Sequence, residues 1–230
     1  EGQTLRQWMT DHPQPTLTDI RRITAQISAG LRAFHRLEMI HQDIKPENIM
    51  IDSNDTIKNI DFGSTRISGI QEINTPLQPN HLPGTLTHAA PEYVLGHSGS
   101  NCSDIYSLGT IVYEMLTGKL PYAKTLSSRN LRQVRYHPAQ QFNAEVPEWI
   151  NAALEKAVHL NPAQRYTLLS EFNYDLCHPN KSFLNKNAAP LIERHPLAFW
   201  KVLATLLAVT CLTLIYFFEG SRSRIIKNIS

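Results

Sequence analysis

The chain has 230 residues, of which 42% are hydrophobic and 18% are charged, so it is long enough for one sizeable domain with additional segments. A net charge of +2 and the lack of a basic stripe exclude the electrostatic pattern of a nucleic-acid-binding protein. Cys102, Cys177 and Cys211 are an odd number at wide spacing. They predict neither a disulfide framework nor a zinc site, and they suit a reducing, cytosolic location for the soluble part.

The first long helix is predicted to begin near Thr16. Its hydroxyl can cap the first turn, and the carboxylate of Asp19 follows three residues later. Apolar residues then recur at helical spacing and predict one buried face, made of Ile20, Ile23, Ile27, Leu31 and Phe34. This helix leads the chain to His41.

A polar segment whose side chains suit catalysis comes next. It reads His41-Gln42-Asp43-Ile44-Lys45-Pro46-Glu47-Asn48, and Asp61-Phe62-Gly63 begins 13 residues after its end. Two carboxylates, an amide and an ammonium at these spacings suit phosphoryl transfer from a metal-bound nucleotide. One carboxylate can accept or orient the proton of an attacking hydroxyl. The other can hold Mg²⁺ together with the amide.

Short elements surround this segment. Residues 49–52 and 56–60 are β-like runs on either side of a turn at 53–55, so they predict a small hairpin. Residues 64–83 are rich in Pro, Asn and Gly, which predicts a flexible loop. After Asp104 the pattern predicts mostly helix as far as about Leu176.

The polar segment resembles the protein kinases, whose catalytic loop reads H-R-D-x-K-x-x-N and whose metal loop reads D-F-G. Further motifs of that family follow in the family's order. They are Leu86-Thr87-His88-Ala89-Ala90-Pro91-Glu92 after Gly84-Thr85, then Asp104-Ile105-Tyr106-Ser107-Leu108-Gly109, then Asn161-Pro162-Ala163-Gln164-Arg165. Together they make a coincidental match very improbable.

The resemblance implies a site that uses ATP and Mg²⁺. In the family's pattern, Asp43 is the catalytic base and Lys45 contacts the nucleotide near the transferred phosphoryl group. Asn48 and Asp61 are the implied Mg²⁺ ligands. Thr85, together with Lys45, is typical of serine/threonine specificity and is expected to support the substrate site.

The same resemblance gives four residues a structural role. His41 is expected to pack under the catalytic loop, and Asp104 is expected to bond the backbone of that loop. Glu92 and Arg165 are expected to form a buried ion pair, in which loss of one partner leaves an uncompensated charge.

The resemblance covers about residues 1–178. The expected fold class is α+β: the mostly helical large lobe of the protein kinase fold, with the small lobe missing. Because the first residue is Glu1 rather than methionine, the natural chain is expected to begin earlier. The glycine-rich loop, the strand lysine and its glutamate partner lie outside this sequence, so the fragment is expected to be inactive by itself.

Residues 197–218 predict a C-terminal transmembrane helix. They contain one charge, Lys201, and at ~1.5 Å per residue they extend roughly 33 Å, enough to cross a ~30 Å hydrocarbon core. The alternative is a buried core helix, although kinases end before this point. Residues 179–196 are then a linker and 219–230 a short tail. Flanking charges slightly favour a cytoplasmic tail, but the need for ATP favours a single-pass protein with a cytoplasmic kinase domain.

This layout has a narrower resemblance, to bacterial proteins in which a metal-dependent Ser/Thr phosphatase precedes a Ser/Thr kinase and a terminal membrane anchor. No phosphatase residue is present in the sequence.

Two residues depart from the kinase pattern. Gln42 replaces an arginine that normally meets a phosphate on the activation loop, which argues against control by loop phosphorylation. His88 replaces a common tyrosine.

Three function classes follow. The first is an ATP-dependent protein Ser/Thr kinase that acts on protein substrates, is bound to a membrane and has no nucleic-acid partner. The second is a membrane-tethered pseudokinase that serves as a binding module. The third is a small-molecule phosphotransferase, a class that usually lacks the segment ending in Glu92 and its late arginine partner. Retention of Asp43, Lys45, Asn48 and Asp61 favours the first.

Overall fold

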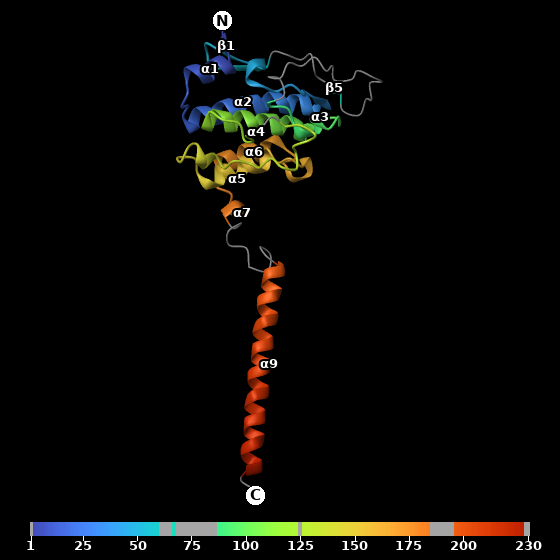
Figure 1. The fold of residues 1–230 in the computed structure, drawn as a ribbon. Helices are drawn as coiled ribbons and strands as arrows, with labels where there is room; N and C mark the ends of the chain where they lie inside the picture. The colour runs from blue at the N-terminus through green and yellow to red at the C-terminus, as the bar shows by residue number, and fades with distance from the viewer. Residues whose placement is uncertain (1, 60–65, 68–86, 124–125, 185–195, 228–230) are drawn as a thin grey trace. The chain divides into compact units, whose positions relative to one another are not determined.

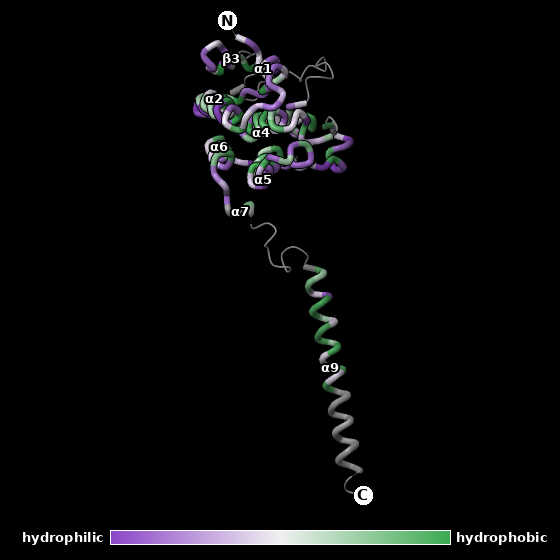
Figure 2. The backbone as a smooth tube through the Cα atoms, turned by 90° about the vertical axis from the view of Figure 1, so that its left-hand side faces the viewer, coloured by the Kyte–Doolittle hydropathy of each residue, from purple (hydrophilic) through white to green (hydrophobic). Residues whose placement is uncertain are grey.

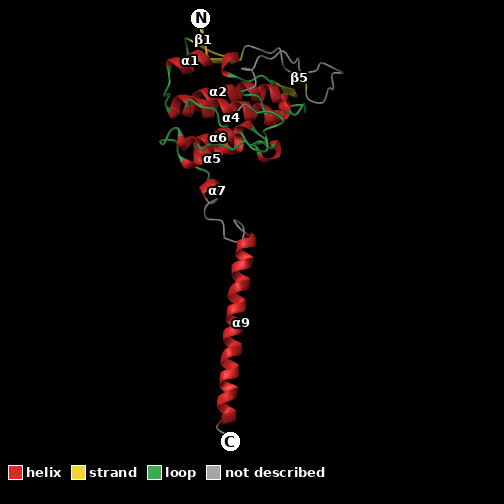
Figure 3. Ribbon diagram, in the orientation of Figure 1, coloured by secondary structure: helices red, strands yellow, loops and turns green. Residues whose placement is uncertain are grey.

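The computed structural model describes residues 2–59, 66–67, 87–123, 126–184 and 196–227. The chain divides into two compact units, Glu1–Phe183 and Leu184–Ser230. Helices dominate the first unit, and its strands are short (Figure 3).

The first unit contains six α-helices of up to 20 residues among its described residues, followed by a short helix at its end. They are α1 (Leu5–Asp11), α2 (Leu17–Arg36), α3 (Pro91–Val94), α4 (Asn101–Thr117), α5 (Glu148–Ala157), α6 (Leu169–Cys177) and α7 (Lys181–Leu184). Single 3-10 turns occur at η1 (Pro46–Asn48), η2 (Ala139–Gln141) and η3 (Pro162–Gln164).

The helix predicted from Thr16 is α2. Thr16 Oγ1 accepts a hydrogen bond from the backbone N–H of Asp19 at 3.1 Å and donates one to its carboxylate at 2.6 Å. Four of the five predicted core residues of this helix are buried, namely Ile20, Ile23, Ile27 and Leu31. The fifth, Phe34, is half-buried, and its ring lies tilted against that of His41 with the ring centres 5.8 Å apart.

Helix α4 lies at the centre of the core. It packs against α2 on one side and α5 on another, while α6 packs against both α2 and α5 (Figure 1). Twelve of its residues are buried, so almost every side of the helix faces protein. The helix ends at Gly118, whose φ of +66° is the left-handed conformation that favours glycine.

The expectation of mostly helical structure from Asp104 to Leu176 is wrong for the middle of that region. Between α4 and α5, the described residues contain no further α-helix, and they form the 3-10 turn η2 and an isolated antiparallel bridge between Tyr122 and Tyr136. Gly118 stops the first helix, and Pro121 and Pro138 then interrupt any continuation because proline removes a backbone donor. Pro147 caps α5 instead of interrupting it.

The predicted hairpin is present. Strands β3 (Ile49–Asp52) and β4 (Ile57–Asn59) pair antiparallel with Ile51 opposite Ile57, and β1 (Gly2–Thr4) pairs with the other edge of β3. Asp52 closes the turn by accepting hydrogen bonds from the backbone N–H groups of Asn54 and Thr56, both at 2.9 Å. The hairpin therefore fixes the chain from Ile49, directly after Asn48, to Asn59.

Residues 64–83 were expected to form a loop, and their described part is a strand. Arg66–Ile67 form β5, which pairs antiparallel with β2 (Met39–Ile40), with Met39 opposite Ile67. The rest of the expected loop lies outside the described residues. The composition of a segment reflects only its local preferences, so it does not reveal a backbone pairing with a distant strand.

The second unit contains α9 (Pro196–Lys227). Among the described residues, its segment Leu197–Leu214 is the one helical stretch long and apolar enough to cross a membrane, and none of that segment is buried. Figure 2 shows this apolar stretch along the first half of the helix. The hydroxyls of Thr205, Thr210 and Thr213 each donate to the carbonyl oxygen three residues earlier at 2.8 Å, so none needs an external partner.

Gly109 of α4 packs closely against the C-terminal end of α5. A Cβ atom at this position would lie 2.9 Å from the Cβ of Ala157 and 3.1 Å from Cγ1 of Val158. Gly109→Ala should therefore lower the free energy of unfolding by roughly 1 kcal/mol. Overpacking costs ~1–3 kcal/mol and alanine's better helix propensity returns about 1 kcal/mol.

Thermal unfolding of the intact protein tests this expectation. Gly109→Ala should lower the Tm by roughly 2–4 °C for each kcal/mol lost, and adding Ala157→Gly should recover part of the loss. A Gly109→Ala protein that melts at or above the wild-type temperature would show that α4 and α5 can separate at no cost.

Candidate active site

The polar segment lies between α2 and the β3–β4 hairpin. Pro46 begins the 3-10 turn η1, and Ile49 begins β3 immediately after Asn48. The helix end and the strand start thus fix both ends of a segment whose residues 41–45 have no regular structure of their own. This arrangement brings Asp43, Lys45 and Asn48 together.

Asp43 is the centre of this group. Lys45 Nζ donates to Asp43 Oδ2 at 2.7 Å, and Asn48 Nδ2 donates to the same oxygen at 2.8 Å. Asn48 Nδ2 also donates to the backbone carbonyl of Asp43 at 2.9 Å. Among the described residues, no hydrogen bond reaches Asp43 Oδ1, so this second oxygen can accept a proton or hydrogen bond from an external hydroxyl.

The carboxylate of Asp43 is partly open to solvent. Its side chain is 22% exposed and that of Lys45 is 20% exposed. A substrate can therefore reach Asp43, while its neighbours restrict the rotation of its carboxylate.

The amide oxygen of Asn48 suits a metal. Because the amide nitrogen is committed to Asp43, the side chain is fixed with Oδ1 as its remaining acceptor, and Mg²⁺ prefers oxygen ligands. Asp61 and Thr85, the other predicted metal ligand and the predicted substrate-site residue, lie outside the described residues. Within the described ranges no group of three His, Cys, Asp or Glu side chains is arranged to hold a metal.

Asp104 binds the backbone at the start of the polar segment. Its carboxylate accepts hydrogen bonds from the backbone N–H groups of His41 and Gln42, both at 3.0 Å, and it lies 2.9 Å from His35 Nε2. Asp104 and His41 are each 1% exposed. Gln42 has a φ of +68°, which is uncommon for a residue other than glycine, and the bond from its own N–H helps to hold it there.

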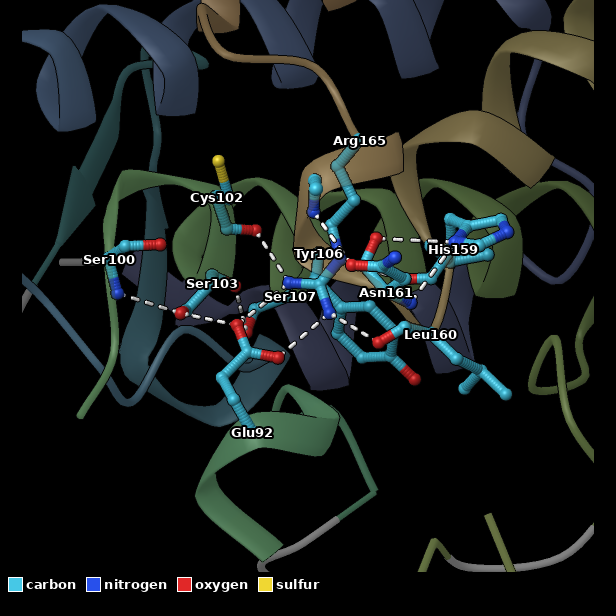
Figure 4. Close-up of polar contacts among 12 residues, drawn as sticks. Glu92, Ser100, Cys102, Ser103, Tyr106, Ser107, His159, Leu160, Asn161 and Arg165 are labelled. Carbon is cyan, nitrogen blue, oxygen red and sulfur yellow. Dashed lines mark hydrogen bonds and ion pairs between the residues drawn. The ribbon is translucent and has the colours of Figure 1, made fainter. Parts of the chain in front are cut away.

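Glu92 of α3 and Arg165 form an ion pair (Figure 4). Two parallel hydrogen bonds of 2.8 Å join the guanidinium to the carboxylate. The remaining N–H groups of Arg165 donate to the backbone carbonyls of His159, Cys102 and Leu160. All five donors of the guanidinium therefore have an acceptor, which is the condition under which a buried charge is tolerated.

The carboxylate of Glu92 has a further hydrogen-bond donor besides Arg165. Ser103 Oγ donates to Glu92 Oε1 at 2.6 Å, and the guanidinium of Arg165 lies 4.8 Å from the ring centre of Tyr106. Burial alone would raise the pKa of Glu92, but the hydrogen bonds and charge of Arg165 outweigh it and lower the pKa below its ordinary value. The pair links α3 to the loop before α6.

The sequence pattern gave no role to Glu114, Arg6 and Glu47, which form a second charged cluster. Arg6 donates to Glu47 Oε1 at 2.8 Å and to both carboxylate oxygens of Glu114, at 2.8 and 3.2 Å. His88 Nε2 lies 2.9 Å from the same Glu114 carboxylate. The sequence signal that could have revealed this cluster was Glu114 itself, a single acidic residue within the otherwise uncharged run 105–117 of a buried helix.

Arg165→Ala should destabilise the domain without changing a residue of the Asp43 group. Removing the guanidinium leaves buried Glu92 without its partner, a loss of roughly 3–5 kcal/mol. Because the folded-state pKa of Glu92 is lowered, this stabilisation is present above the ordinary carboxyl pKa of 4.5 and is lost as pH falls through the folded value. The difference between the variant and wild type should therefore shrink in acid.

Chemical denaturation at pH 7 and at pH 3–4 measures both parts of this expectation. Arg132→Ala is the matched control, because Arg132 is exposed. If Arg165→Ala and Arg132→Ala unfold at the same denaturant concentration at pH 7, the ion pair contributes nothing to stability.

Comparison with known proteins identifies relatives of this chain. Residues 1–177 match the family described as "Protein kinase domain". The chain is 30% identical over 187 residues to a probable serine/threonine-protein kinase of Clostridium acetobutylicum, an alignment that covers 80% of this chain and 28% of the relative.

Two further relatives are similar to a comparable extent. Serine/threonine-protein kinase PrkC of Bacillus subtilis is 31% identical, with 76% of this chain and 27% of the relative covered. Serine/threonine-protein kinase PknB of Mycobacterium leprae is 33% identical, with 76% of this chain and 28% of the relative covered. The chain thus spans little more than a quarter of the length of the curated relatives it matches.

Proposed function

This chain belongs to the protein kinase family, and we propose that it supplies the large lobe of an ATP-dependent protein serine/threonine kinase. The reaction moves the γ-phosphoryl group of ATP to serine or threonine hydroxyls of proteins. The observation that carries this proposal is the convergence of Lys45 and Asn48 on a single oxygen of Asp43. The names of the relatives, all serine/threonine-protein kinases, support it.

The arrangement gives each side chain of the group a separate task. Asp43 accepts the hydrogen bond and then the proton of the substrate hydroxyl through Oδ1, while Oδ2 is held by its two neighbours. Lys45 supplies a positive charge beside the transferred group, where negative charge develops on the equatorial oxygens. Asn48 fixes the orientation of Asp43, which keeps the base aligned with the attacking oxygen.

Mg²⁺ would be held by Asn48 through Oδ1 and by Asp61. When bound, it neutralises the charge of the phosphates and orients them for in-line displacement. Thr85 and Lys45 are the pair that we propose for serine/threonine specificity. Our proposal includes a small lobe encoded before Glu1, so the activity experiments below use the full-length protein.

Asp43→Asn in the full-length protein should abolish phosphoryl transfer and leave ATP affinity within a few-fold of wild type. The amide keeps the hydrogen bonds that fix position 43 but cannot accept a proton, and the proposed metal ligands are unchanged. General-base loss typically costs ~10²–10⁴-fold in rate. Turnover and nucleotide binding are measured on the same preparation.

Asp61→Ala serves as the contrasting variant, because loss of a metal ligand should weaken Mg-ATP binding together with turnover. If Asp43→Asn retains near-normal turnover, Asp43 is not the base. If the wild-type protein binds Mg-ATP but transfers no phosphate to any protein, the pseudokinase alternative replaces this proposal.

We further propose that α9 anchors the protein in a membrane as a single span, with the kinase domain on the cytoplasmic side where ATP is present. Support comes from the apolar, exposed segment Leu197–Leu214 and from its internally bonded threonine hydroxyls, since unbonded polar groups are costly in lipid. An upstream metal-dependent phosphatase domain is the corresponding hypothesis for the coding region before Glu1.

Deleting residues 197–230 should release the protein into the soluble fraction. Deleting only residues 219–230 should leave it membrane-bound, because the apolar segment survives that change. Carbonate extraction of cells that express each form distinguishes them. Carbonate-resistant association of the larger deletion would mean that an anchor lies elsewhere in the full-length protein.

A further inference from the structure

The chain from the end of α4 to the start of α5 carries positive charge alone. Residues 115–144 contain five lysine or arginine residues and no aspartate or glutamate, the five being Lys119, Lys124, Arg129, Arg132 and Arg135. Lys124 lies outside the described residues. The whole chain has a net charge of only +2, so the remainder of the chain is net acidic and the positive charge is concentrated in this segment.

Helical turns give two faces to the middle of the segment. The backbone N–H groups of Leu131 and Val134 each donate to the carbonyl four residues earlier, at 3.2 and 3.1 Å. Residues three apart share a face of such a turn. Leu131 and Val134 therefore lie on one face, and Arg129 and Arg132 lie on another.

The apolar face attaches the segment to the region around α3. Leu131 and Val134 pack against a small hydrophobic cluster that includes Ala90, the residue just before α3, and Tyr93 of α3 packs against the same cluster. Ala90 follows Thr85, the residue proposed above for the substrate site, by five positions. The basic segment is therefore fixed close in the chain's packing to the region proposed to meet a protein substrate.

The opposite face presents three guanidinium groups to solvent. Arg129, Arg132 and Arg135 are exposed, and within the described ranges no ion pair or side-chain hydrogen bond joins them to another residue. Like charges three residues apart repel each other. A carboxylate from another molecule would relieve that repulsion, and a guanidinium can bind it through two parallel hydrogen bonds.

Glu114, a carboxylate that shares a surface cavity with the basic segment, already has partners. It accepts two hydrogen bonds from Arg6 and lies 2.9 Å from Nε2 of His88. Lys119 and His137 line the same cavity, whose volume is about 420 Å³. A basic side chain that entered the cavity would find its carboxylate occupied and a lysine beside it, so this surface favours an acidic partner.

The exposed residues of the turns favour a protein over a lipid surface or a nucleic acid. From 127 to 135 these residues are Ser128, Arg129, Arg132, Gln133 and Arg135, and none of them is apolar or aromatic. Binding in a lipid interface uses an apolar face that enters the headgroup region. Binding of single-stranded nucleic acid uses aromatic side chains on which the bases stack.

We propose that Arg129, Arg132 and Arg135 form a docking surface for a stretch of aspartate and glutamate residues in the protein substrate. This inference rests on the proposed kinase function, because it takes the docked protein to be the one that is phosphorylated. Docking raises the effective concentration of the substrate hydroxyl near Asp43. The contacts are between exposed charges, so salt weakens them.

The first experiment measures binding without activity. Full-length protein is held in phosphatidylcholine nanodiscs, and the probe is a fluorescent synthetic peptide with one serine and a run of glutamates. A second peptide carries glutamine in place of every glutamate. The test variant combines Arg129→Gln with Arg132→Gln. The matched control combines Arg32→Gln with Arg36→Gln, two exposed arginines of α2 whose loss changes the net charge equally.

Wild type and the α2 control should bind the glutamate peptide equally well. The Arg129/Arg132 variant should bind it roughly two- to thirtyfold more weakly, the range expected for two exposed charge pairs. Added salt should weaken wild-type binding, and the glutamine peptide should bind every protein more weakly than the glutamate peptide binds wild type. All variants should melt at the wild-type temperature. If the Arg129/Arg132 variant does not fold, Arg135→Gln alone decides.

Three results would overturn the proposal. One is equal affinity of wild type and the Arg129/Arg132 variant for the glutamate peptide. Another is an equal loss of affinity in the α2 control, which would show that only net charge matters. The third is wild-type binding to phosphatidylserine vesicles that requires Arg129 and Arg132, without binding of the peptide, which would assign the surface to lipid.

The second experiment separates docking from the proposed function. In the active full-length protein, the Arg129/Arg132 variant should raise KM for the glutamate peptide by the same factor as Kd, with kcat and KM for ATP unchanged. An unchanged peptide KM would overturn the role in substrate docking. A wild-type protein that binds the peptide through these arginines and transfers no phosphate would count against the proposed function, while the acidic docking surface itself would be confirmed.

Discussion

The hydrogen bonds from the backbone of His41 and Gln42 to the carboxylate of Asp104 are the constraint on which the site depends. They hold Gln42 in a left-handed conformation, with φ at +68°, which the chain would not adopt without support. This turn directs the next residue, Asp43, toward Lys45 and Asn48. His35 contacts the same carboxylate from α2, so the buried charge is surrounded by donors and the cost of burying it is offset.

Sequence reasoning anticipated the parts of the fold that local patterns encode. The cap at Thr16, the apolar face of α2 and the β3–β4 hairpin depend on residues close together in the chain, so spacing and turn chemistry suffice to find them. The ion pair of Glu92 and Arg165 is not local. It was anticipated because the motifs around both residues resemble those of a family, not because of any physical signal in the sequence.

The remainder depended on contacts that the sequence does not reveal. The segment between α4 and α5 lacks long helices because Gly118, Pro121 and Pro138 stop them, so the prediction of helix from apolar spacing was wrong there. The pairing of β2 with β5 and the cluster around Glu114 join residues that are distant in the chain. For Asp61 and Thr85 only the resemblance assigns a role.

The first turn of α4 has a consequence for motion within the domain. Ser103 holds Glu92 of α3, and its neighbour Asp104 holds the loop that carries Asp43. Both carboxylates lie at the positive end of one helix dipole, which stabilises their ionised forms. Because adjacent residues of one helical turn bind both segments, α3 and the loop that carries Asp43 share a single support. A change in their spacing must therefore break a hydrogen bond at Ser103 or at Asp104.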